Sequence, residues 1–219
     1  MRKLKIEDND ITLRLEEPKD YKEVENLTRE AFWNVNSLGC NEHYLMHIMR
    51  NSQSFISELC YVAVYNGKII GNIAYTHAVI LSDVTKHAVI SFGPLSVLPE
   101  FQKRGIGSRL ILKTKELALQ MGHKAILIYG DPDYYCRFGF IPAEALRIQT
   151  SNEMYSPALL VLELTPGALS GISGSFCEDF VFEVDLTKSE EFDKTFPKKE
   201  KLVTPSQARF NQLISRMHK

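Results

Sequence analysis

The stretch Gln102-Lys-Arg-Gly-Ile-Gly107 decides the fold, because two closely spaced glycines stand directly before a long helical pattern. Gly105 and Gly107 lack a Cβ atom, so successive backbone N–H groups can converge on one ligand there. Residues 108–121 place apolar side chains at helical spacing, which predicts a helix that begins near Ser108. The free N–H groups and positive dipole end of that helix favour an anion, and a pyrophosphate suits such a turn.

Two common phosphate-binding motifs do not match this turn. No Gly-Lys-Ser/Thr follows it, as a Walker A loop requires, and no third glycine completes the G-x-G-x-x-G pattern of dinucleotide-binding folds. Kinases and nicotinamide-dependent dehydrogenases are therefore disfavoured. Taken alone, the two glycines have a second interpretation, in which they only ease the passage from a strand to a helix.

The chain on either side of the turn predicts a mixed α/β fold. Residues 87–98 have a strand pattern before the turn, and residues 124–129 form a buried strand pattern after the helix. A strand, a helix and a second strand in this order imply a parallel crossover. Further upstream, Asn66-Gly67 joins two apolar runs, residues 59–65 and 68–81, and predicts an antiparallel hairpin.

The remaining elements follow from shorter patterns. We expect strands at 11–15, 158–164 and 180–186, helices at 18–33, 43–50, 131–138 and 205–217, and a charged, exposed segment at 188–201. The glycines and serines between 167 and 175 predict a loop. A chain of 219 residues favours one domain with an appendage, with the domain over residues 1–165 and a C-terminal extension, residues 166–219, packed on it or trailing from it.

The strand at 87–98 carries an interruption in its middle. Gly93-Pro94 stands there, and proline cannot donate a ladder hydrogen bond, whereas glycine often marks a bulge. The pairing of this strand is therefore expected to break near Pro94.

Composition and charge exclude several classes of protein. Twenty-six basic and 27 acidic residues give a net charge of −1, so no general positive field would gather nucleic acid. No apolar run approaches the roughly 20 residues that cross a bilayer, and residues 1–10 lack the apolar stretch of a secretory signal. We therefore expect a cytoplasmic protein without a nucleic-acid or membrane partner.

The cysteines give no sign of a metal or redox centre. Cys40, Cys60, Cys136 and Cys177 are far apart and contain no C-x-x-C pair. We expect four reduced and mostly buried thiols, and no metal site.

Two motifs resemble a known family, the GNAT superfamily of N-acetyltransferases. Gln102-Lys-Arg-Gly-Ile-Gly107 resembles its acyl-CoA-binding motif, usually written Gln/Arg-x-x-Gly-x-Gly/Ala, and Tyr135-Cys-Arg-Phe-Gly-Phe140 resembles its second motif. The resemblance runs from about Ile11 to Leu164, and Gly93-Pro-Leu-Ser-Val97 is similar to the YhbS-like branch. It implies a GNAT-like, mostly antiparallel central sheet with flanking helices and a splayed parallel strand pair that holds acyl-CoA.

The resemblance also implies the residues that hold the coenzyme. Backbone groups of Leu95 and Val97 would bind the pantetheine arm in the gap between the parted strands. The pyrophosphate would lie on the turn and helix start, formed by Gln102, Lys103, Arg104, Gly105, Ile106, Gly107 and Ser108. Many relatives have an asparagine before the second motif, whereas this chain has Gly130-Asp131-Pro132, so the contact to the adenine end does not carry over.

The implied activity is direct transfer of the acetyl group of acetyl-CoA to a primary amine of a small molecule or a protein. Tyr135, four residues before Gly139, matches the tyrosine that many members place beside the coenzyme sulfur, and Tyr134 is the neighbouring alternative. No general base is evident from spacing, and the candidates are Glu30, His77, Asp83, His87 or a chain of water molecules.

Other interpretations stay open at this point. A non-catalytic acyl-CoA sensor would keep the turn and lose the chemistry, and a phosphate-binding domain would not bind CoA at all. An acyl-enzyme on Cys136 is disfavoured because no histidine and carboxylate accompany it. By resemblance, the acceptor pocket is expected around residues 33–44 and 151–157, and a homodimer is compatible with the sequence.

Overall fold

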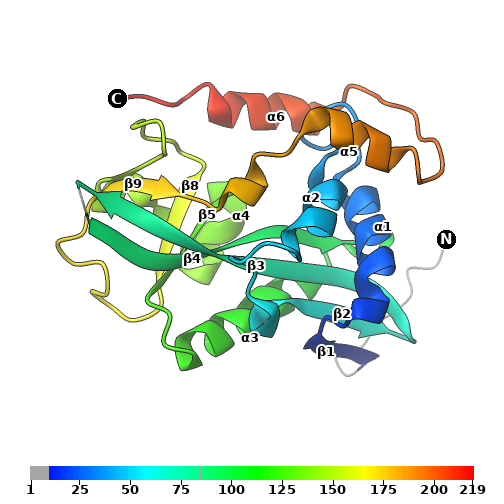
Figure 1. Ribbon diagram of the computed structural model, residues 1–219, viewed down its shortest axis with the longest axis horizontal. Helices are drawn as coiled ribbons and strands as arrows, with labels where there is room; N and C mark the ends of the chain where they lie inside the picture. Colours follow the sequence, from blue (N-terminus) through cyan, green and yellow to red (C-terminus); the bar gives the residue numbers. More distant parts are fainter. Residues whose placement is uncertain (1–9, 84) are drawn as a thin grey trace.

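In a computed structural model, which describes residues 10–83 and 85–219, helices flank one central sheet (Figure 1). Residues 1–10, in which no secretory signal is expected, lie outside the described residues except for Asp10. The strands are β1 (Ile11–Leu15), β2 (Tyr61–Tyr65), β3 (Lys68–Ser82), β4 (Thr85–Val97), β5 (Ala125–Tyr129), β6 (Ile141–Pro142), β7 (Ile148–Gln149), β8 (Leu159–Glu163) and β9 (Gly174–Cys177). The helices are α1 (Tyr21–Phe32), α2 (Glu42–Met49), α3 (Ile106–Gln120), α4 (Pro132–Tyr135), α5 (Leu186–Asp193) and α6 (Pro205–Ile214).

The sheet is mixed and mostly antiparallel, as expected. Its order is β1-β2-β3-β4-β5-β8-β6, and β9 pairs with the far end of β3. Strands β4 and β5 are parallel and pair only at Ile90 and Ile126, with α3 as the crossover between them. The predicted hairpin is confirmed, because Asn66 and Gly67 both take the positive φ angles, 48° and 78°, that a tight two-residue turn requires.

The predicted interruption of β4 is confirmed as a bulge. Ile73 on β3 faces Leu95, and Tyr75 faces Phe92, so two steps along β3 correspond to three along β4. The extra residue falls at Gly93-Pro94, whose peptide bond is cis. Beyond Ile90, β4 therefore separates from β5 and leaves a gap in the sheet.

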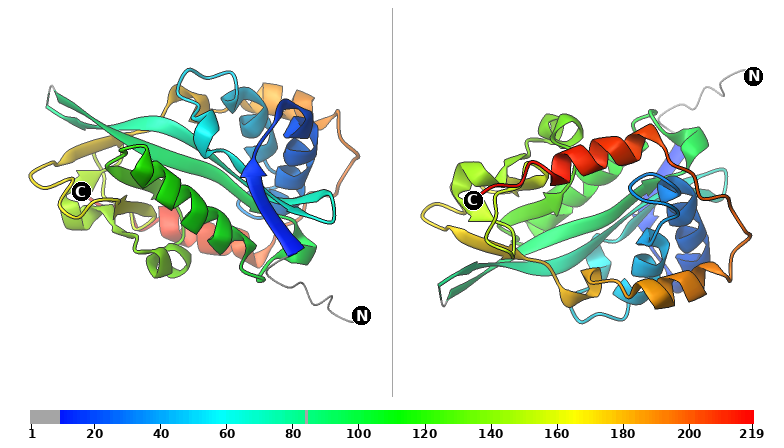
Figure 2. Two further views of the ribbon diagram at one scale, coloured as in Figure 1. Left: turned by 90° about the horizontal axis from the view of Figure 1, so that it is seen from below. Right: turned by 90° about the horizontal axis from the view of Figure 1, so that it is seen from above.

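Helices cover both faces of the sheet, as two neighbouring residues of β3 show. A Cβ on Gly71 would lie 3.1 Å from Ile106 of α3, so this face packs against α3. The next residue, Asn72, points the other way, and its Oδ1 accepts a hydrogen bond from Thr28 Oγ1 of α1 at 3.3 Å. In Figure 2, α3 lies on one side of the long strands β3 and β4, and α1 and α2 lie on the other.

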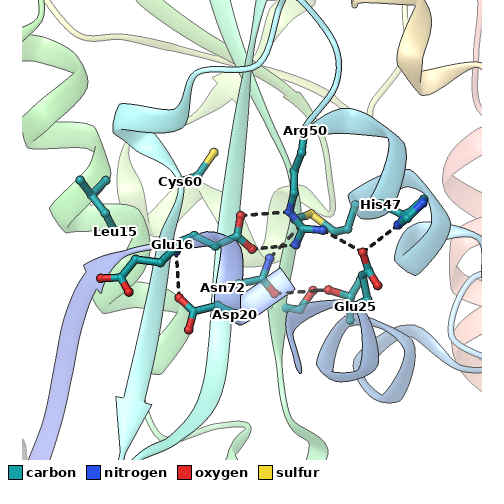
Figure 3. A network of polar contacts seen from close by, with 12 residues as sticks. Leu15, Glu16, Asp20, Glu25, His47, Arg50, Cys60 and Asn72 are labelled. Atoms are coloured by element: carbon teal, nitrogen blue, oxygen red, sulfur yellow. Dashed lines mark hydrogen bonds and ion pairs between the residues drawn. The ribbon is translucent and has the colours of Figure 1, made fainter. Parts of the chain in front are cut away.

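A buried ion-pair network fixes α2 against α1 and the end of β1 (Figure 3). Arg50 donates to both carboxylate oxygens of Glu16, at 2.7 and 3.1 Å, and to Glu25 of α1 at 3.0 Å. His47 lies 3.0 Å from the same oxygen of Glu25. Because the three charged side chains Arg50, Glu16 and Glu25 are less than 10% exposed, the network holds the two helices in one relative position.

The structure corrects the expectations for the C-terminal extension. Residues 180–186 form no strand: Asp179 caps the 3₁₀ helix η7 (Phe180–Phe182) through Val181 N, and Asp185 caps α5. The strand β9 lies instead at Gly174–Cys177, where a loop is expected. The alternation misleads because capping aspartates satisfy the backbone locally, which favours helical turns.

The segment expected to be exposed at 188–201 is partly buried. Asp193 at the end of α5 accepts a hydrogen bond from Arg29 Nε of α1 at 2.6 Å, and Arg29 is 1% exposed. Phe196 is buried against His43 of α2.

The expectation for the thiols is also wrong in part, because Cys40 and Cys60 are buried whereas Cys136 is exposed and Cys177 is partly exposed. Across residues 10–83 and 85–219, no helix is both long and apolar enough to cross a membrane.

Candidate functional site

A cavity of about 470 Å³ lies where β4 carries its bulge and separates from β5. Gly93, Pro94 and Leu95 form its floor, and Tyr129 and Tyr135 form the wall on the β5 side. Phe92, Gly130, Asp131 and Ala158 also line the cavity. The remaining lining residues come from the end of α1 and its connection to α2, from α2, η7 and α6: Phe32, Val35, Asn36, Glu42, Leu45, Phe182, Ser206, Arg209, Phe210 and Leu213. The cavity therefore joins the strand gap to the N-terminal helices and to the C-terminal extension.

The backbone of β4 beyond the bulge faces the gap. Leu98 N donates to Ile70 O of β3 at 3.0 Å, and alternate residues of an antiparallel strand direct their backbone groups to the partner. The backbone groups of Leu95 and Val97 therefore point away from β3, toward the missing strand. Gln102 Nε2 donates to Val97 O at 3.1 Å from that side. Free strand edges of this kind can pair with an extended, amide-bearing ligand.

The turn before α3 has the shape that anion binding requires. Gly105 has φ 79° and Lys103 has φ 59°, and the first i→i−4 hydrogen bond of the helix runs from Arg109 N to Gly105 O at 2.9 Å. The helix begins at Ile106, two residues before the expected start near Ser108. The N–H groups of the first helical turn precede that first hydrogen bond, so they remain directed along the axis toward a ligand.

The residues of the turn differ in their surroundings. Lys103 is exposed, and the Arg104 guanidinium lies 5.7 Å from the centre of the Phe101 ring. Gly107 is the tightest position: a Cβ there would lie 2.8 Å from the Tyr134 hydroxyl. Tyr134, through its hydroxyl, therefore lies over the start of α3, and its ring is stacked by Arg137 at 4.1 Å.

Tyr135 lines the cavity, and its ring contacts that of Tyr134 edge-on, with 4.9 Å between the centroids. Its ring packs against Phe92 and Phe140, with centroids 5.9 and 5.8 Å away, and a Cβ on Gly130 would collide with it. Burial raises the pKa of the Tyr135 hydroxyl well above its usual value, so the group stays protonated and able to donate. The two neighbouring tyrosines thus face different parts of the site.

The four side chains considered as general bases do not line the cavity. Glu30 pairs with Lys199 at 2.8 Å, and His77 lies 5.9 Å from the His123 ring. Asp83 follows β3 at the connection to β4, and His87 pairs with Ile80 in the same hairpin.

Glu42, at the first position of α2, is the residue that sequence reasoning missed. It lines the cavity, and its oxygens accept hydrogen bonds from Asn36 Nδ2 at 3.1 Å and from Asn41 N at 3.0 Å. Burial raises the pKa of its carboxyl group above the usual value. A lone glutamate at a helix start is common, so only its placement within the expected acceptor segment, residues 33–44, points to it.

The C-terminal segment spans the cavity and is attached on both sides. Gln207 of α6 donates to Asn34 O and Ser37 O of the α1–α2 connection, at 3.1 and 3.0 Å. On the far side, His218 pairs through backbone hydrogen bonds of 2.7 and 3.1 Å with Tyr155. The right view of Figure 2 shows α6 running from the α1–α2 connection toward the other end of the molecule. Residues beyond 165 therefore form one wall of the cavity.

Parts of the chain are similar in sequence to known acetyltransferases. Residues 57–142 match the model of the acetyltransferase (GNAT) domain family. An 84-residue part of the chain is 36% identical to the uncharacterized N-acetyltransferase YjhQ of Escherichia coli K12 and spans 46% of it, about half its length. The uncharacterized N-acetyltransferase YhbS of the same strain is 24% identical over 162 residues, 74% of this chain and 92% of YhbS.

Two solved structures share the fold. The Escherichia coli YhbS structure in complex with CoA aligns with a TM-score of 0.70 at 24% identity, over 80% of this chain and 93% of YhbS. A GNAT family acetyltransferase from Brucella melitensis, in complex with acetyl-CoA, aligns with a TM-score of 0.63 at 25% identity, over 78% and 97% of the two chains. The chain therefore has the GNAT fold, and its residues 57–142 are similar to the acetyltransferase domain of that family.

Proposed function

We propose that the protein transfers the acetyl group of acetyl-CoA directly to a primary amine. The observation that carries this proposal is the gap beyond Ile90, where the backbone of Leu95 and Val97 faces away from β3 and leads to the turn at Gly105. An extended pantetheine arm would pair with that strand edge, and the pyrophosphate would lie on the first N–H groups of α3. The complexes of YhbS with CoA and of the Brucella protein with acetyl-CoA support this placement.

The residues proposed for coenzyme binding are those of the strand edge and the turn: Leu95, Val97, Gln102, Lys103, Arg104, Gly105, Ile106, Gly107 and Ser108. Backbone N–H groups are proposed to carry most of this role, because positive φ angles, as at Lys103 and Gly105, are typical of turns whose N–H groups converge on an anion. The residues beyond 165 are proposed to belong to the same domain, since α6 lines the cavity.

Tyr135 is proposed as the proton donor to the departing thiolate. In the transfer, the N–C bond forms and the C–S bond breaks. A primary ammonium loses two protons overall: Tyr135 gives its hydroxyl proton to the departing sulfur, one amine proton restores that hydroxyl, and the other reaches the solvent. The Tyr135 side chain lines the cavity, and burial raises the pKa of its hydroxyl, so the group enters the step protonated. The N–H groups at the bulge are the candidates to hold the oxyanion.

A steady-state assay tests the function. Purified protein is incubated with acetyl-CoA and a panel of primary amines, and free CoA thiol and acetylated amine are measured together. The proposal expects both products in equal amounts. Tight CoA binding without turnover across the panel would instead favour the acyl-CoA sensor.

A further inference from the structure

We propose that the acceptor is a small amine with an apolar body and no carboxylate, and that Glu42 receives its ammonium group in the cavity. The inference rests on the proposed function and names the class of substrate. Three observations carry it: the apolar lining, the charge pattern of the walls, and the position of α6.

The cavity walls are mainly aliphatic and aromatic. The same space as the bulge of β4 is lined by Phe32 at the end of α1, Val35 just after it, Leu45 of α2, and Phe210 and Leu213 of α6. A lining of this kind favours an apolar ligand body, because binding there removes the methylene groups of the ligand from water. Sugars and polyhydroxylated amines would leave their hydroxyl groups without partners there.

The charges on the walls single out Glu42. The lining includes Asp131 and Arg209, but these two pair with each other at 3.0 Å. Among the described residues, the hydrogen-bond donors on Glu42 are neutral, the Asn36 amide and the Asn41 N–H group. A half-buried carboxylate without a cationic partner attracts a cation, and it disfavours a second carboxylate in the same space.

The position of α6 limits the size of the acceptor. Between the attachments of Gln207 to Asn34 O and of His218 to Tyr155, the helix forms a wall along the cavity. A volume of about 470 Å³ accommodates a molecule of modest size and also the acetyl end of the coenzyme. We therefore propose a small free amine as the acceptor rather than a lysine on a folded protein surface.

Binding of three matched probes to the protein saturated with CoA tests the proposal. The probes are 2-phenylethylamine, its neutral isostere 2-phenylethanol, and phenylalanine, which adds a carboxylate, and titration calorimetry measures each affinity. We expect the amine to bind about tenfold or more tightly than the alcohol, as a charge-assisted hydrogen bond predicts, and phenylalanine to bind most weakly.

Two isosteric variants locate the effect. Glu42→Gln is expected to reduce the preference for the amine over the alcohol to nearly one. The matched control is Glu178→Gln, which alters another half-buried carboxylate that hydrogen-bonds Ser91 at 3.3 Å and is not among the lining residues. It should keep the preference. The denaturant midpoint of each variant checks that it folds. If Glu42→Gln does not fold, the affinities of the three probes for the wild-type protein still decide the acceptor class.

The outcomes separate this inference from the proposed function. If phenylalanine or the alcohol binds as tightly as the amine, or if Glu42→Gln keeps the preference, the acceptor class is wrong. Because CoA carries no acetyl group, these affinities do not depend on turnover. Absence of acetyl transfer to an amine that binds would contradict the proposed function and leave the binding site intact.

Discussion

Arg209 on α6 donates hydrogen bonds to both carboxylate oxygens of Asp131, at 3.1 Å from Nε and 3.0 Å from Nη2. Asp131 immediately precedes α4, the helix that ends at Tyr135. A contact across 78 residues of sequence thus connects the C-terminal helix to the wall that carries the proposed proton donor. The C-terminal extension and the coenzyme motifs therefore meet at one cavity.

Removing this contact should affect the acceptor more than the fold. Arg209→Ala is expected to raise the KM for the amine severalfold and to leave acetyl-CoA affinity nearly unchanged, because α6 lines the cavity but contributes no residue to the proposed coenzyme site. Both side chains are more than a third exposed, so the denaturant midpoint should change little. Lys188→Ala, which removes an exposed ion pair on α5, is the matched control and should leave the KM unchanged.

The same pair predicts a response to acid. The hydrogen bond from Arg209 lowers the pKa of Asp131 below its usual value. A carboxyl group whose pKa is lower in the folded state stabilises the protein at neutral pH, and this contribution is lost as the pH falls through the lowered pKa. Acid unfolding of wild type and Asp131→Asn should therefore converge at low pH. Curves that stay equally separated at every pH would contradict the role of the pair.

Gly130→Ala should impair catalysis through Tyr135. A Cβ at position 130 would collide with the tyrosine ring, so the ring must move away from its place in the cavity. We expect kcat to fall while acetyl-CoA affinity is largely kept, since Gly130 lies outside the turn before α3. In the Tyr135→Phe background, Gly130→Ala should add little further loss, and a double-mutant cycle measures this. Fully additive losses would show that the two positions act independently.

Tyr135→Phe keeps the ring and removes the hydroxyl. If that hydroxyl protonates the leaving thiolate, kcat should fall by roughly 10² to 10⁴ with little change in CoA binding. Tyr134→Phe is the matched control, because its hydroxyl lies by Gly107 at the start of α3 and not in the cavity lining. That change should weaken CoA binding slightly and spare kcat. Equal activity of wild type and Tyr135→Phe would remove Tyr135 from the chemistry.

Gly107→Val should weaken CoA binding far more than folding. A Cβ there would lie 2.8 Å from the Tyr134 hydroxyl, in the first turn of α3, where the pyrophosphate is proposed to bind. At Gly105 no atom lies within 4 Å of such a Cβ, so Gly105→Val acts instead through its φ of 79°. CoA titration and denaturant midpoints compare the two variants. Unchanged affinity in both would contradict the assigned pyrophosphate turn.

Local patterns were sufficient to predict the central part of the fold. Asn66-Gly67 predicted the hairpin, Gly93-Pro94 the bulge, and Gly105 with Gly107 the turn before α3, because each depends on backbone properties of the residues themselves. Tyr135 could be singled out because a short motif fixes its distance from the glycine that ends the helical turn.

The acceptor side could not be predicted in the same way. Glu42 and Arg209 reach one cavity only because α2 and α6 pack from opposite ends of the chain, and no periodicity records such a long-range contact. The alternation at 180–186 predicted a strand, but Asp179 and Asp185 cap helical turns there. Residues 188–201 carry many charges, yet Asp193 pairs with the buried Arg29, so charge alone did not indicate exposure.

Titration of the wild-type protein with acetyl-CoA measures the proposed coenzyme binding itself. We predict one molecule bound per chain with an affinity in the micromolar range, and a rise in melting temperature that follows from mass action. Gly107→Val should reduce the heat of binding under the same conditions. No measurable binding of either acetyl-CoA or CoA to folded wild-type protein would contradict the account as a whole.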